Sequence, residues 1–127
     1  MSIITPELVA LDVALGATSG DVIDALSTIV AGAGRATDAH ALAADAHARE
    51  AQTSTGMPGG IAIPHCRTAA VTEPTLAFAR LSDPVDFGDD DPSDLVFFIA
   101  APIGADTDHL AILSTIARAL GREGFVD

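Results

Sequence analysis

The sequence has no lysine, tyrosine or tryptophan, and its 127 residues include a single cysteine. One cysteine excludes an internal disulfide and suits a reducing compartment. Aromatic residues make up only 4% of the chain, so few side chains can stack on nucleic-acid bases or sugar rings. The six basic residues are all arginines scattered along a chain of formal net charge −12. Without a basic stripe, a nucleic-acid partner is not expected.

Long apolar runs are also missing. Although 49% of the residues are hydrophobic, no uninterrupted apolar segment reaches the roughly 18 residues that a membrane helix needs. Residues 1–6 contain no basic region of the kind that opens a signal peptide. We therefore expect one cytoplasmic domain, long enough for a single sheet-and-helix core.

The spacing of apolar residues predicts helices that alternate with strands. Helices are predicted at 20–32, capped by Ser19, at 39–51, capped by Asp38, and at 107–120. Strands are predicted at 61–63, 75–81 and 94–101, while residues 8–13 fit either a strand or a helical turn. The continuous apolar run at 94–101 is typical of a central strand covered on both faces. This order of elements predicts a layered α/β domain.

The segment from Gly59 to Arg67 contains the candidate catalytic residue, His65. This histidine follows a short apolar strand and a proline, and the glycine-rich loop 53–58 precedes that strand. The arrangement places an imidazole at the end of a rigid element, beside backbone that can approach an anion. Imidazole is largely neutral and nucleophilic near pH 7. We predict that His65 carries the chemistry, against the alternative of a structural or solvated histidine, whereas His40 and His47 are expected on the surface.

Arg49 and His109 complement His65 chemically. A neutral imidazole nitrogen can attack phosphorus, a guanidinium can bind phosphoryl oxygens through two hydrogen bonds, and a second imidazole can donate another. His109 lies just inside the predicted start of the last helix, where free N–H groups favour an anion. The glycine-rich loop, through Thr55 and Gly56, is expected to add donors that support a phosphate. Together these residues predict a site that handles a phosphoryl group.

Other chemistries fit the sequence less well. A metal site made from His65, Cys66 and His109 lacks the usual ligand spacing, and adjacent residues of a strand point to opposite sides. The same alternation argues against Cys66 as a nucleophile with His65 as its base, so we expect a half-buried, inert thiol. The run Asp89–Asp91 is expected to be a solvated turn, because it lacks the spaced ligands of a calcium site. We expect neither a metal nor a cofactor.

Eight short motifs, in order along nearly the whole chain, resemble one protein family. They are Ile4–Val9, Gly34–Asp38, Arg49–Glu50, Ser54–Gly56, Gly60–His65, Val85–Gly88, Asp94–Phe97 and His109–Leu113. Their order and spacing are similar to those of the enzyme IIA domain of the fructose/mannitol family of the bacterial phosphoenolpyruvate-dependent sugar phosphotransferase system. Within that family, the match is nearest to the IIA domain of fructose permeases.

The resemblance implies a layered sandwich with a mixed β-sheet flanked by helices. It also implies a domain that accepts a phosphoryl group from the phosphohistidine of the carrier HPr and passes it to a cysteine of enzyme IIB, which phosphorylates the sugar during uptake. The phospho-acceptor maps to His65, through Nε2, the supporting arginine to Arg49 and the second active-site histidine to His109. Contact with the membrane would be indirect, through a IIC permease.

The sequence departs from the family pattern in two ways, and two other functions remain as alternatives. Family domains continue for another helix and a short strand, so residues 1–127 are predicted to be a IIA-like domain truncated at the C-terminus, and no IIB or IIC segment is present. A regulatory IIA protein of the nitrogen-related branch would use the same histidine for signalling. A non-catalytic module of anion transporters lacks the phospho-acceptor motif, so Ile63–Pro64–His65 argues against it. The sugar is not readable, because IIA domains do not contact it.

Overall fold

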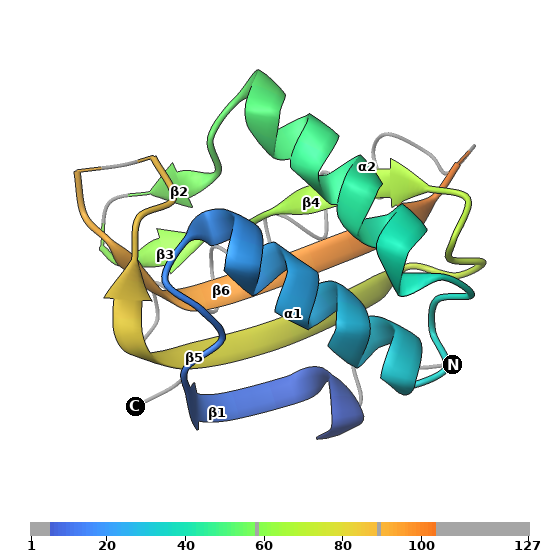
Figure 1. Cartoon of the computed structure of the whole chain (residues 1–127), viewed down its shortest axis with the longest axis horizontal. Helices are drawn as coiled ribbons and strands as arrows, with labels where there is room; N and C mark the ends of the chain where they lie inside the picture. The colour runs from blue at the N-terminus through green and yellow to red at the C-terminus, as the bar shows by residue number, and fades with distance from the viewer. Residues whose placement is uncertain (1–5, 58, 89, 104–127) are drawn as a thin grey trace.

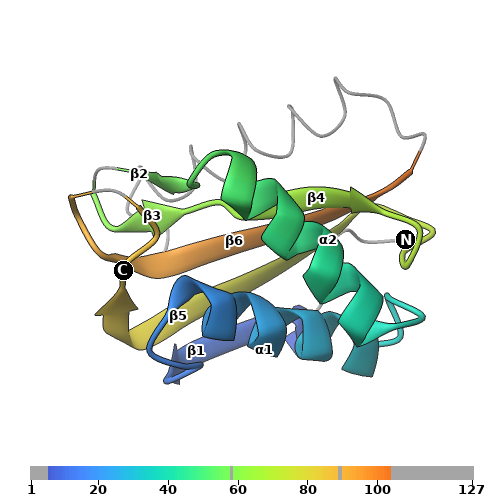
Figure 2. The same cartoon turned by 45° about the horizontal axis from the view of Figure 1, so that its top comes forward.

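The computed structural model describes residues 6–57, 59–88 and 90–103, which form a six-stranded mixed sheet with two helices packed across one face (Figure 1, Figure 2). In chain order the elements are η1 (Pro6–Leu8), β1 (Val9–Val13), α1 (Ser19–Gly32), α2 (Ala39–Gln52), β2 (Gly56–Met57), β3 (Ile61–Ala62), β4 (His65–Thr68), β5 (Thr75–Val85) and β6 (Ser93–Pro102). The strand order is β1-β5-β6-β3-β2, and β4 also pairs with β6. The predicted α/β layered sandwich with a mixed sheet is confirmed. Neither described helix is long and apolar enough to cross a membrane.

Strand β6 lies at the centre of the sheet, as its continuous apolar sequence predicts. It pairs antiparallel with β5 and parallel with β3 and β4. On the helix side, Val96, Phe98 and Ala100 join the buried cluster that includes residues of α1 and α2. On the opposite side, Phe97 packs against Phe78 with ring centroids 4.9 Å apart. Because both faces of β6 are buried, the strand is a rigid support for whatever pairs with it.

Each described α-helix begins at a side-chain cap. Helix α2 starts after Asp38, as predicted, and the carboxylate accepts hydrogen bonds from two amides of the first turn. Helix α1 is capped by Thr18 and not by the predicted Ser19. The reason is Asp21, which lies three residues after Thr18, so that the side chain of each residue accepts the backbone amide of the other. Such reciprocal caps satisfy donors that the helix itself leaves free.

The strand predicted just before His65 is present as β3 and ends at Ala62, so His65 follows a strand end as predicted. The sequence did not predict that the chain then continues as a second strand in the same register. Ile61 pairs with Leu95 and His65 pairs with Ile99, which keeps the register along β6 unchanged across Pro64. Proline removes one donor and interrupts the ladder, but its backbone remains extended. His65 is therefore the first residue of a strand, β4.

One assignment that the sequence left open is resolved, and two further segments differ from the prediction. Residues 8–13 divide into the end of a 3-10 turn and the edge strand β1, which pairs in parallel with β5. Strand β5 runs past its predicted end at Leu81 and reaches Val85 through an irregular register with β6. Within the predicted glycine-rich loop, β2 forms a short antiparallel pair with β3. The helix predicted at 107–120 lies outside the described residues.

Candidate functional site

His65 is half-buried at the start of β4 and is oriented by the backbone just before it. Its Nδ1 lies 2.7 Å from the carbonyl oxygen of Ile63. A carbonyl oxygen can only accept a hydrogen bond, so Nδ1 carries the proton and donates it. In the neutral ring Nε2 is then the unprotonated nitrogen, the one whose lone pair can attack an electrophile.

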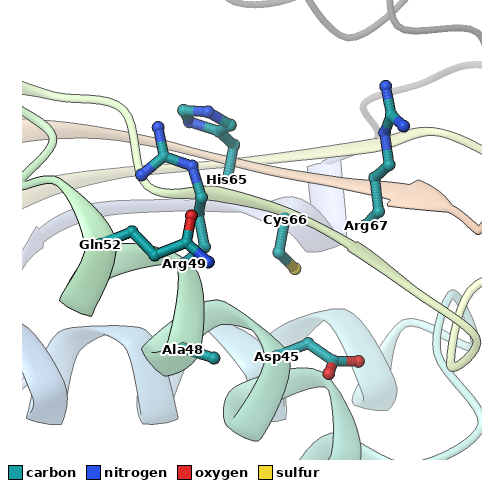
Figure 3. A pocket seen from close by; sticks show the side chains of 7 residues that line it. All are labelled: Asp45, Ala48, Arg49, Gln52, His65, Cys66 and Arg67. Carbon is teal, nitrogen blue, oxygen red and sulfur yellow. The ribbon is translucent and has the colours of Figure 1, made fainter.

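Arg49 and His65 line the same hollow, which has a volume of about 360 Å³ and lies between the end of α2 and β4 (Figure 3). The other lining residues are Asp45, Ala48, Gln52, Cys66 and Arg67. Arg49 belongs to the last turn of α2, and its Nη1 donates to the carbonyl oxygen of Thr53 over 3.1 Å. In Figure 3 the guanidinium and the imidazole lie on the same side of β4. The fold thus brings together two of the residues singled out from the sequence.

A second arginine, which the sequence reasoning missed, also lines the hollow. Arg67 is exposed and lies two residues after His65 on β4, so both side chains leave the same face of the strand. The alternation would have indicated Arg67 if the strand had been predicted to continue past Pro64. Among the described residues that line the hollow there are two guanidinium groups and one carboxylate, that of Asp45, so the hollow is suited to an anion with several oxygens.

Cys66 points to the opposite side of β4, toward α2 (Figure 3). Its side chain is 4% exposed. Burial first, and then the negative charge of Asp45, raises the pKa of the thiol to about 12. At neutral pH the thiol is protonated and is neither a nucleophile nor a metal ligand. The predicted inert thiol is confirmed, and it is more deeply buried than the sequence indicated.

The amides of Thr55 and Gly56, expected to be donors for an anion, already have protein partners. Thr55 donates through its backbone N and its Oγ1 to the two carboxylate oxygens of Glu50, over 2.9 and 2.8 Å. The amide of Gly56 donates to the carbonyl oxygen of Phe87 over 3.0 Å. Neither residue belongs to the lining of the hollow. Their role in supporting a phosphate stays a prediction, while the observed contacts show that they hold the loop in shape.

The two other described histidines, His40 and His47, both lie on α2 and do not line the hollow. His109 lies outside the described residues, so its expected place beside His65 stays a prediction. His40 is exposed on α2. His47 contacts Asp24 across the two helices, with Nε2 and Oδ1 2.8 Å apart. Within residues 6–57, 59–88 and 90–103, no three His, Cys, Asp or Glu side chains are grouped as metal ligands.

Comparison with known proteins agrees with this α/β fold. The family model described as "Phosphoenolpyruvate-dependent sugar phosphotransferase system, EIIA 2" matches residues 2–127. The chain is 41% identical over 126 residues to the PTS system fructose-specific EIIA component of Haloferax volcanii, covering 97% of this chain and 81% of that protein. It is 45% identical over 105 residues to the PTS system fructose-specific EIIABC component of Bacillus subtilis, covering 81% of this chain and 16% of that protein. The chain therefore belongs to the EIIA family of the phosphotransferase system.

Solved structures show the same fold. The nitrogen regulatory protein IIA-Ntr from Neisseria meningitidis superposes with a TM-score of 0.80 at 29% identity, covering 91% of this chain and 79% of that chain. The Escherichia coli complex of enzyme IIAMTL and phosphorylated enzyme IIBMTL gives a TM-score of 0.73 at 24% identity, covering 91% of this chain and 80% of that one. The family and the fold expected from the sequence motifs are both confirmed.

Proposed function

We propose that His65 accepts a phosphoryl group from the phosphohistidine of HPr and passes it to a cysteine of enzyme IIB, in support of the uptake of fructose or a related sugar. The observation that carries this proposal is the hydrogen bond from Nδ1 of His65 to Ile63, which leaves Nε2 as the nucleophile in a hollow lined by Arg49. The family supports the reaction class, and the fructose-specific relatives support the sugar class.

The transfer proceeds in two balanced steps. In the first step, a bond forms between phosphorus and Nε2 of His65 while the bond between phosphorus and the imidazole of HPr breaks. Positive charge builds on the ring of His65, and the carbonyl of Ile63 stabilises it at Nδ1–H. In the second step, the thiolate of the enzyme IIB cysteine attacks phosphorus, and Nε2 leaves with its electron pair. Arg49 binds phosphoryl oxygens in both steps, so that positioning and electrostatics supply the catalysis.

The partners and the location are consequences of the same relay. The solved complex of enzyme IIAMTL with phosphorylated enzyme IIBMTL supports an enzyme IIB domain as the acceptor for this chain. A related protein described as an EIIABC component supports a link between the domain and a permease. In this role the domain works in the cytoplasm and meets the membrane only through a IIC permease.

Labelling by phosphorylated HPr tests the acceptor. The His65→Ala variant should take up no label, because the attacking nitrogen is gone, and mass spectrometry of the wild type should place the phosphate on His65. The His40→Ala variant is the matched control, since His40 is exposed on α2 and should label normally. Undiminished labelling of His65→Ala would rule out the assignment.

Arg49 has a separate test. The Arg49→Ala variant removes the guanidinium and should slow phosphoryl transfer about 100-fold. This is the usual effect of removing one hydrogen-bond donor that stabilises a transition state. Arg80→Ala is the matched control, because Arg80 pairs with Asp12 over 3.0 Å and does not line the hollow. Circular dichroism checks that both variants fold. Wild-type rates in Arg49→Ala would remove Arg49 from the site.

A second candidate is a regulatory IIA protein of the nitrogen-related branch. The observation that favours it is the TM-score of 0.80 with the nitrogen regulatory protein of Neisseria meningitidis. The two functions differ in the fate of the phosphoryl group once His65 carries it. A sugar-uptake domain passes the label to the cysteine of a purified fructose enzyme IIB. A regulator keeps the label on His65, and its binding to another protein depends on whether His65 is phosphorylated.

A further inference from the structure

A series of hydrogen bonds connects the end of α2 to the candidate nucleophile. The carboxylate of Glu50 accepts two hydrogen bonds from Thr55, the carbonyl of Thr55 accepts the amide of Ile63 over 3.2 Å, and the carbonyl of Ile63 accepts Nδ1–H of His65. We propose that Glu50 is a positioning residue that holds His65 in its Nδ1–H form through Thr55 and Ile63. The inference rests on the proposed role of His65 as the phospho-acceptor.

The placement of Glu50 indicates a use other than helix stability. It belongs to the last turn of α2, where the helix dipole disfavours a carboxylate. Both of its oxygens are used by one residue, Thr55, which is 8% exposed. If the carboxylate were removed, two donors of a buried residue would lose their acceptor at once. The loop after α2 is therefore anchored by Glu50.

Ile63 transmits this anchoring to the imidazole. Its N–H is held by the carbonyl of Thr55, and its own carbonyl faces Nδ1 of His65. Strand β3 ends before Ile63, and Pro64 has no N–H, so regular pairing is interrupted where the orienting carbonyl lies. The nitrogen that carries the proton is set by the hydrogen bond that its ring makes. If the Ile63 carbonyl were displaced, the Nδ1–H tautomer would lose its preference over the Nε2–H tautomer.

The same loop also touches the second group of the site. Arg49 donates to the carbonyl of Thr53, so the guanidinium and the imidazole are both oriented by the segment that Glu50 anchors. Loss of the anchor is thus expected to loosen both groups, and a displacement of about 1 Å in a reacting group can cost about 100-fold in rate. The expected loss of rate in a folded variant distinguishes Glu50 from a residue that only stabilises the fold.

Nitrogen-15 NMR of the unphosphorylated protein tests the proposal directly. At a pH where His65 is neutral, its side-chain correlations report which ring nitrogen carries the proton. We expect Nδ1–H in the wild type, a mixture of tautomers in Glu50→Ala, and an intermediate result in Glu50→Gln, which keeps one acceptor oxygen. Glu73→Gln is the matched control, since it makes the same charge change at an exposed position and should match the wild type.

Phosphorylation by HPr gives the second readout. Glu50→Ala should label roughly 10- to 100-fold more slowly than the wild type, with Glu50→Gln in between and Glu73→Gln unchanged. A wild-type tautomer ratio in folded Glu50→Gln and Glu50→Ala would overturn the proposal, even if labelling slowed. If Glu50→Ala does not fold, Glu50→Gln decides. If the wild type itself takes no label, the proposed function fails, and the tautomer measurement still tests Glu50.

Discussion

The single thiol of Cys66 makes the stability of this chain depend on pH above neutrality. Burial and the nearby charge of Asp45 raise its pKa in the folded protein from 9.0 to about 12. In the unfolded chain the thiol ionises near its ordinary value. Between these two values the unfolded state loses a proton that the folded state keeps. The stability is therefore complete below about pH 9 and is lost as the pH rises toward the folded pKa.

The absence of two residue types allows this effect to be measured cleanly. Lysine and tyrosine ordinarily titrate near pH 10, and neither occurs in the sequence. Histidines titrate well below this range and arginines above it. At pH 10 the unfolded thiol is about nine-tenths ionised while the folded thiol stays protonated. The free energy of unfolding should then be lower by about 1.4 kcal/mol than at pH 7, which is RT ln 11.

Urea unfolding followed by far-ultraviolet circular dichroism is the appropriate assay, because the chain has no tryptophan or tyrosine for fluorescence. Measurements at pH 7, 8.5 and 10 should show the free energy of unfolding falling, while the slope of that free energy against urea concentration stays constant. Cys66→Ala is the matched control, and its profile should be flat over the same range. A flat profile in the wild type, or an equal slope in Cys66→Ala, would refute the link between the buried thiol and alkaline stability.

Three other substitutions, one of them paired with a comparison variant, test the fold that supports the site, each measured by urea unfolding at pH 7. Asp38→Ala removes the N-cap of α2 and should cost about 1 kcal/mol; an unchanged midpoint would contradict the capping role. Phe98→Ala empties a fully buried position between the sheet and the helices and should cost about 3–5 kcal/mol, whereas a loss below about 1 kcal/mol would contradict tight packing. Gly88→Ala should cost at least about 1 kcal/mol, because a Cβ at φ +95° would collide with Ser54; Gly34→Ala, at φ +78° in open space, should cost less.

The two described helices and the central strand are predictable because their signals are local. Asp38 is a cap that acts on the residues directly after it, and the apolar run of β6 needs no partner to be recognised. The continuation of the chain past Pro64 is different, since proline ordinarily ends a strand and only the pairing with β6 keeps the segment extended. Strand β2 has two residues and exists only through its pairing with β3. No local pattern could indicate it.

The candidate site divides in the same way. His65 and Arg49 are recognisable from residue type and motif, but their shared hollow depends on how α2 packs on β4. The protonated nitrogen of His65 depends on the carbonyl of Ile63, which no sequence pattern specifies. The loop around Thr55 has the composition of an anion-binding segment, yet both hydrogen bonds that Thr55 donates are accepted by the carboxylate of Glu50. Sequence shows which donors exist, and only the structure shows which acceptor they reach.

The proposed relay also explains why the hollow is not more strongly cationic. Transfer from one phosphohistidine to another changes little in bond energy, so a site that bound the phosphoryl group too tightly would slow its departure. Arg49 already donates one of its hydrogen bonds to Thr53, and the carboxylate of Asp45 lines the same hollow as Arg49 and Arg67. Both features weaken the attraction for an anion without removing it. Phosphoryl transfer then depends mainly on the orientation of His65 and on its unprotonated Nε2. It depends less on the strength of the electrostatic attraction for the phosphoryl group.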